Sequence, residues 1–391
     1  MKVAPIYLTG FFKSTFGILL FVIGLLSVSG AYIAAASEPR HFWMTYLVAF
    51  IFCLTLSLGS LFFVMVHYLS RAAWGVVFRR ISENLMILIP LVGLFFIPII
   101  AAMPEIFFWT HPGEAMRKLL YLNTPFFVCR AVFYFAIWTG FSVYYYRVSI
   151  NQDKTGETGL AVKLARIAPV GILLYALTQT FAGIDWVMSL SHAWFSTMFP
   201  VEVFSASVIS ALCLAMVLMT FLRKISPMFR QWANLEHYHA LAKLIYGFNL
   251  LWALAVFTQY FVTWYANLPE ETLFYIPRTV GAWHSWVPIL VFGHFFIPFF
   301  LWMSRHVKRN IIASTLVALL MLGVQYLHWY WMIVPSVFPE GLKVGLLDAS
   351  VGAGMMAMFL GAFFCLLGRR SIVAYRDPWL AESLSLDNSV H

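Results

Sequence analysis

The sequence between residues 42 and 68 reads FWMTYLVAFIFCLTLSLGSLFFVMVHY and contains no Asp, Glu, Lys or Arg. A helix needs about 20 apolar residues to cross the hydrocarbon core of a bilayer. No water is available there, so backbone groups must pair within the chain, which leaves helices or closed β-barrels. Apolar and polar residues do not alternate along this run, as they do in barrel strands. The run therefore predicts a membrane-spanning helix.

Nine further runs have the same character, so we predict an all-α integral membrane protein with ten transmembrane helices. Only 10% of the residues are charged, whereas a soluble domain carries about 25%, and this difference excludes a soluble globule. The runs are 11–36, 42–68, 84–103, 121–146, 167–186, 200–222, 240–266, 279–304, 310–335 and 343–367. Residues 1–368 are thus predicted to form a single transmembrane domain, and residues 369–391 a polar, mostly unstructured cytoplasmic tail.

Lys and Arg residues are distributed unevenly between the segments that separate the runs. If the N-terminus is cytoplasmic, 19 of them lie in inner segments or at the inner ends of runs, and 5 lie in outer segments or at the outer ends of runs. Arg130 alone lies deep within a run. Cytoplasmic loops carry an excess of Lys and Arg, so we predict that both termini are cytoplasmic. The same clusters account for the net charge of +9, and they favour contact with anionic lipid rather than nucleic acid.

A faint internal repeat relates the second to fifth helices, about 42–186, to the sixth to ninth helices, about 200–335. Gln179 and Gln325 lie at similar depth in the last helix of each unit, and an aromatic-rich segment follows each of them. The repeat predicts two four-helix bundles flanked by the first and tenth helices, since parallel repeats build other membrane bundles. The alternative to a true internal repeat is chance similarity between apolar helices.

Ionisable groups at membrane depth cost free energy, so they mark candidate functional positions. Most of them fall near the outer side, and together they suggest a polar track for protons or a quinol-like pocket. The candidates are Arg130, Asp185, Glu202, Gln259, His284, His294, His328 and, near the inner side, His67.

Arg130 needs a carboxylate or a lipid headgroup at its depth, and Asp185 is the natural partner, with Glu202 second. The pair could be a structural clamp or part of a functional pocket, and a lipid phosphate is the third alternative. We predict that Arg130 contacts Asp185 and that Gln259, His284 and His328 face the same interior space. If this track conducts protons, Asp185→Asn slows proton-coupled turnover.

No cofactor is predicted to bind this chain. Each of the four cysteines stands alone in an apolar run, so no motif for c-type haem, iron–sulfur or zinc is present. His284 and His328 form the only plausible histidine pair for a b-type haem. The cysteines are Cys53, Cys129, Cys213 and Cys365.

Four segments resemble the large membrane subunits of alternative complex III, a bacterial quinol:cytochrome c oxidoreductase. They are YLNTPFFVCR (121–130), DWVMSL (185–190), WFSTMF (194–199) and QYFVTWYANLPEE (259–271). The last segment and the short chain are most similar to quinone-binding subunit 2, or ActF, which is related to the polysulfide-reductase and NrfD-type membrane subunits.

The resemblance implies a ten-helix subunit in the bacterial cytoplasmic membrane. It also implies partners: a multihaem cytochrome c, an iron–sulfur subunit and a sister quinol-binding subunit, which carry the haem c and the clusters. For this chain it implies scaffolding and proton passage, with quinol as a possible ligand. A stand-alone secondary transporter and a b-haem electron carrier are the alternative functions.

Overall fold

The computed structural model describes residues 4–111, 121–191, 194–341 and 344–386, and within these ranges it contains helices but no strand. Ten helical spans are long and apolar enough to cross a membrane, as predicted. Eight of them are single helices: α1 (Thr15–Ala34), α2 (Pro39–Leu69), α6 (Thr124–Thr155), α7 (Gly159–Trp186), α8 (Phe199–Ile225), α10 (Leu235–Ala266), α16 (Ile311–Ile333) and α17 (Leu346–Leu367).

The other two spans are interrupted helices. The third consists of α3 (Val76–Met86) and α4 (Ile89–Ala101), and Pro90 in the first turn of α4 lacks the N–H that would continue the hydrogen-bond ladder. The eighth runs from Gly281 to Met303 through a 3₁₀ turn, α13 (Trp286–Leu290), a π-helical turn at Val291–Phe296 and α14 (Ile297–Met303).

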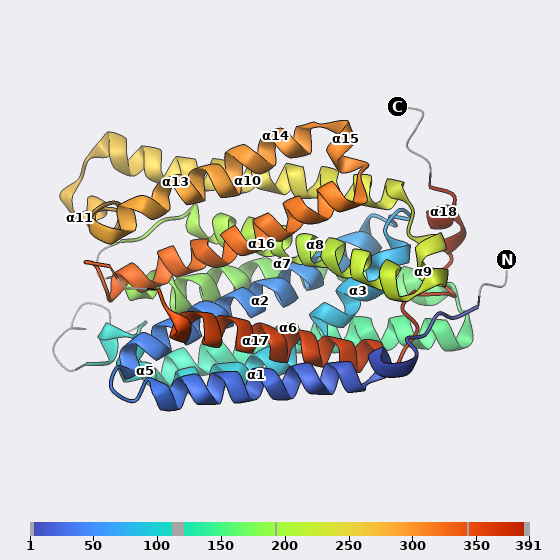
Figure 1. The fold of residues 1–391 in the computed structure, drawn as a ribbon, viewed down its shortest axis with the longest axis horizontal. Coiled ribbons are helices and arrows are strands. Elements are labelled where there is room, and N and C mark those ends of the chain that lie inside the picture. Colours follow the sequence, from blue (N-terminus) through green and yellow to red (C-terminus); the bar gives the residue numbers. More distant parts are fainter. Residues whose placement is uncertain (1–3, 112–120, 192–193, 342–343, 387–391) are drawn as a thin grey trace.

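Helices α2 and α8 form the centre of the molecule, and they are the two most buried spans. They pack against each other so closely that a Cβ atom at Gly59 would overlap the carbonyl oxygen of Ser207. Around α2 lie α3, α4 and α7, while α10 and α16 pack on α8. Helix α1 lies along α17 at the edge (Figure 1).

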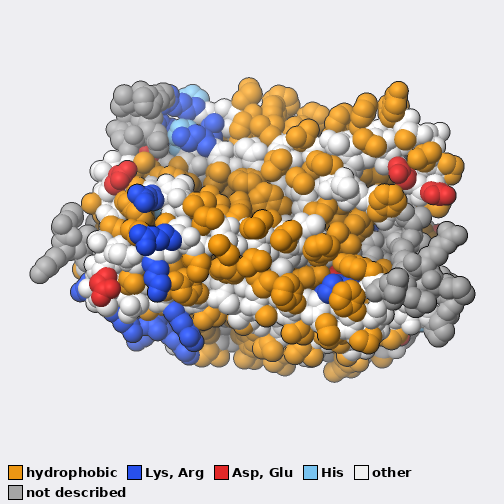
Figure 2. Space-filling view, turned by 180° about the vertical axis from the view of Figure 1, so that it is seen from behind, with side chains coloured by type: hydrophobic (Ala, Val, Ile, Leu, Met, Phe, Trp, Pro, Cys, Tyr) orange, Lys and Arg blue, Asp and Glu red, His pale blue; other side chains and the backbone are white. Residues whose placement is uncertain are grey.

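Both chain termini lie at one end of the helix bundle, which we call the termini end (Figure 1). On the face shown in Figure 2, Lys and Arg side chains gather at this same end, whereas the middle of that face is hydrophobic. Short helices lie between the spans at the two ends: α5 (Met103–Ile106), α9 (Pro227–Trp232), α11 (Pro269–Thr272), α12 (Ile276–Thr279) and α15 (Arg305–Lys308). A further short helix, α18 (Leu380–Leu384), follows the last span.

The prediction of an unstructured tail is wrong for residues 369–386. Ile372 and Val373 are fully buried, and the Ile372 N–H donates to the carbonyl oxygen of Ile6 at 2.8 Å. Leu380 in α18 is buried as well. The segment packs across the termini end because it contains hydrophobic residues that are buried there and because its one aspartate pairs with Arg79.

Candidate functional site

The end of the bundle opposite the termini holds a buried ion pair between α6 and α7. Arg130 donates from Nε and Nη2 to the two carboxylate oxygens of Asp185, at 2.8 and 2.9 Å. The Tyr134 hydroxyl donates to the same carboxylate at 2.9 Å. This bidentate geometry confirms the predicted partner of Arg130 and is the strongest form of an Arg–carboxylate contact.

The surroundings of this pair are aromatic. The Arg130 guanidinium lies 3.9 Å from the ring centroid of Tyr121 and 4.4 Å from that of Phe126, and Nη1 donates to the Tyr121 carbonyl oxygen. Burial, and secondarily the Asp185 carboxylate, raises the pKa of Tyr121 to about 12. Both carboxylate oxygens of Asp185 accept hydrogen bonds from α6, an arrangement suited to joining two helices.

A second polar cluster lies between α8, α10 and α16, and its centre is Glu202 in the first turn of α8. One Glu202 oxygen contacts His328 Nε2 at 2.7 Å, and the other accepts a hydrogen bond from the Gln259 amide. The position at a helix N-terminus also favours a negative charge. All three side chains are buried, so a carboxylate, an imidazole and an amide share one site inside the protein.

His294 adjoins this cluster from the π-helical turn. Its Nε2 lies 2.6 Å from the Gln325 side-chain oxygen, and its ring stacks on Trp252 with centroids 3.6 Å apart. The rings of His294 and His328 are 6.0 Å apart. π-Helical turns often occur at functional sites. The irregular backbone of this span and the pair of histidines therefore mark the same region as a candidate site.

An apolar pocket of about 460 Å³ borders the second cluster, and His328 contributes to its wall. The other lining residues come mainly from α10 and from the interrupted span, and include Trp252 and Trp331. Leu254 and Phe257 on its rim are 57% and 62% exposed, so the pocket opens on the outer surface of the helices, where lipid would lie. We call this space the lipid-side pocket.

Two sequence-based expectations about the candidate residues are wrong. His284 is exposed on a 3₁₀ turn, 3.1 Å from the Thr279 carbonyl oxygen, and does not face the interior. His67 lies where it was expected, buried in the last turn of α2 at the termini end and next to Phe63 and Trp74. No hydrogen bond between described residues joins the two clusters, so the expected single track is two separate sites.

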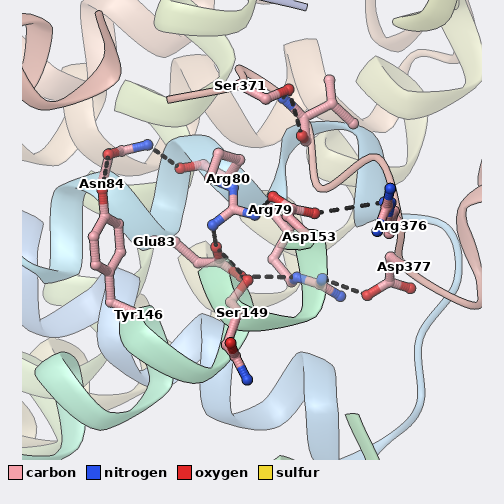
Figure 3. Close-up of polar contacts among 12 residues, drawn as sticks. Arg79, Arg80, Glu83, Asn84, Tyr146, Ser149, Asp153, Ser371, Arg376 and Asp377 are labelled. Atoms are coloured by element: carbon pink, nitrogen blue, oxygen red, sulfur yellow. Dashed lines mark hydrogen bonds and ion pairs between the residues drawn. The ribbon is translucent and has the colours of Figure 1, made fainter. Parts of the chain in front are cut away.

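A third polar cluster, at the termini end, was not predicted (Figure 3). Arg79 on α3 contacts Glu83 at 3.1 Å and Asp377 of the C-terminal segment at 2.5 Å. Arg80 contacts Glu83 at 2.8 Å and pairs with Asp153 of α6. The sequence signal was present, since Arg and Glu three and four residues apart face the same side of a helix, but these residues were assigned to a loop.

Among the residues that the structure describes, no three His, Cys, Asp or Glu side chains are grouped as metal ligands. The absence of bound cofactors therefore stays a prediction. No family model matches the chain, and no curated protein matches it either.

Proposed function

We propose that this chain is a membrane subunit of a bacterial quinol:cytochrome c oxidoreductase of the alternative complex III type. In this proposal, the ten spans form two four-helix bundles flanked by α1 and α17. The subunit supports a multihaem cytochrome c, an iron–sulfur subunit and a sister quinol-binding subunit, and conducts protons without binding a cofactor of its own. The resemblance of residues 121–130 and 259–271 supports the assignment.

The contact between Glu202 and His328 beside the lipid-side pocket is the observation that carries the proton role. Imidazole is the side chain that gains and loses a proton near neutral pH, and a carboxylate in contact with it can exchange that proton. An apolar pocket with one polar wall also suits the ring of a membrane-soluble quinol. A quinol hydroxyl that reached this wall would meet His328, and the proton would pass on to Glu202.

Replacing Glu202 with Gln is expected to slow quinol oxidation by the purified complex at least about tenfold, because the amide cannot take up a proton. The measurement compares turnover, proton release and haem content with those of wild type. Glu270→Gln, an exposed carboxylate of α11, is the matched control and should behave as wild type. Unchanged turnover and proton release in Glu202→Gln would rule out this pair as the proton path.

The orientation of the chain gives a separate prediction. Both termini and the loop containing α9 should face the cytoplasm, since 19 of the 24 Lys and Arg residues other than Arg130 then lie inside. In a Cys129→Ser background, which removes the exposed native cysteine, Met228→Cys should resist an impermeant thiol reagent in intact cells. Glu270→Cys, at the other end, should react; the opposite pattern would reverse the topology.

A stand-alone secondary transporter is the second candidate function, and the interrupted eighth span favours it. Transporters commonly bind their substrates where helices are broken near mid-membrane, and here a π-helical turn carries the buried His294. Purification under mild detergent separates the two functions. A transporter is isolated alone, whereas the proposed subunit brings haem-bearing partners with it.

A further inference from the structure

A large basic pocket lies at the termini end, between the ends of α8 and α9 on one side and α15 and the start of α16 on the other. Its volume is about 1110 Å³. Six of its lining side chains are cationic or can become so, and no Asp or Glu is among the described residues that line it. They are Arg223, Lys224, Arg230, Arg305, His306 and Arg309. We call this space the basic pocket.

Most of this charge has no counter-ion among the described residues. Glu236 pairs with Arg309 at 3.0 Å, so five permanent cations less one carboxylate leave four positive charges. The side chains of Lys224 and Arg305 are exposed and form no hydrogen bond or ion pair with another described residue. The Arg309 Nε is buried and has no hydrogen-bond partner among these residues. Cations held this close together repel one another, and an anion in the pocket would relieve that repulsion.

The surface next to the basic pocket is suited to acyl chains. Ile312, in the first turn of α16, lines the pocket and is 72% exposed. Leu316 and Leu319 follow it at helical spacing and are also exposed, so one face of α16 presents an apolar stripe that leads away from the charges. The pocket therefore lies where the charged end of the molecule meets its hydrophobic middle.

From this combination we infer that the basic pocket binds the phosphate headgroup of an anionic phospholipid whose acyl chains lie along α16. The cations form two sets, Arg223, Lys224 and Arg230 on one side and Arg305 and Arg309 on the other. A headgroup with two phosphates joined by a short linker matches these two sets of cations better than a headgroup with one phosphate does. The expected order of affinity is therefore cardiolipin, then phosphatidylglycerol, then phosphatidylcholine. Basic pockets between helix ends bind such headgroups, each Lys or Arg adding about 1 kcal/mol.

Lipid binding to the delipidated full-length protein, purified with whatever partners accompany it, tests the inference. Native mass spectrometry measures the dissociation constants of cardiolipin, phosphatidylglycerol and phosphatidylcholine. Lys224→Gln/Arg305→Gln is expected to weaken cardiolipin binding roughly 30-fold, because two phosphate contacts are lost. Neither side chain has a partner among the described residues, so the fold should be kept. Arg147→Gln/Arg166→Gln is the control: it removes two exposed charges outside the pocket and should leave the affinity unchanged.

Inorganic phosphate is titrated separately to distinguish a lipid from a free anion. We expect no saturable binding of phosphate in the millimolar range and strong selectivity for cardiolipin over phosphatidylcholine. Tight phosphate binding without lipid selectivity would assign the pocket to a soluble anion and overturn the proposal. So would equal cardiolipin affinities for the pocket variant and the control variant. None of these outcomes depends on the redox role proposed above.

Discussion

Replacing Asp185 with Asn is expected to lower the free energy of unfolding by about 3–5 kcal/mol, because the buried Arg130 loses its counter-ion. An amide can accept only one of the two Arg130 hydrogen bonds and carries no charge. Unfolding by SDS titration in mixed micelles measures the loss. Glu270→Gln on the exposed surface should change stability by less than about 0.5 kcal/mol.

The double variant Arg130→Met/Asp185→Asn separates the lost attraction from the cost of an unpaired charge. With both charges removed, most of the stability should return, since buried pairs replaced by uncharged groups are often neutral. Sequence alone raised a different expectation for Asp185→Asn, slower proton-coupled turnover. If stability and haem content stay at wild-type levels while turnover falls, Asp185 belongs to a proton path, and a purely structural role for the Arg130–Asp185 pair is contradicted.

The number of spans and the pairing of Arg130 with Asp185 could be predicted from sequence, because both follow from the free-energy cost of placing polar and charged groups in the hydrocarbon core. A run without charges must be a spanning helix, and a lone Arg within such a run must find an acid at its own depth. Depth alone does not tell which side of a helix faces which neighbour. Glu202 was considered a second partner for Arg130, yet it faces α10 and α16 and pairs with Gln259 and His328.

His284 shows that depth in the membrane also does not reveal local irregularities of the backbone. The sequence predicts a continuous helix around it, but the span begins with a 3₁₀ turn at Gly281, whose φ is +61°, and the turn leaves the imidazole exposed. The nearby His294, ten residues later, lies in the π-helical turn, which no hydropathy pattern reveals. Local backbone irregularities thus decided which histidine joined the buried cluster.

The unpredicted cluster at the termini end has a different cause. Its charges interrupt the apolar pattern, so the third run was predicted to begin at residue 84, although α3 begins at Val76. Arg79, Arg80 and Glu83 are fully buried there because their partners come from α6 and from the C-terminal segment. Pairing over such sequence distances cannot be inferred from local composition.

The replacement of Arg79 by Met is expected to have the other large effect, a loss of about 3–5 kcal/mol in the free energy of unfolding. Arg79 is fully buried, lies over the Tyr68 ring and contacts both Glu83 and Asp377. Without it, three carboxylates share the single cation Arg80, and the excess negative charge has no solvent to screen it. Arg369→Met, which removes an exposed cation of the same segment, is the control and should be nearly neutral.

The C-terminal segment should respond to Arg79→Met more sharply than the spans do. Asp377 is anchored to α3 through Arg79, so its release exposes the bond after Arg376 to trypsin. We expect cleavage there to be at least about tenfold faster than in wild type at a temperature where far-ultraviolet circular dichroism is unchanged, because local opening follows the lost free energy. Arg79→Lys keeps the charge but has no planar guanidinium to reach both carboxylates, so its cleavage rate should lie between those of wild type and Arg79→Met. Cleavage at the wild-type rate in Arg79→Met would mean that the buried apolar residues Ile372, Val373 and Leu380 hold the segment without the ion pair.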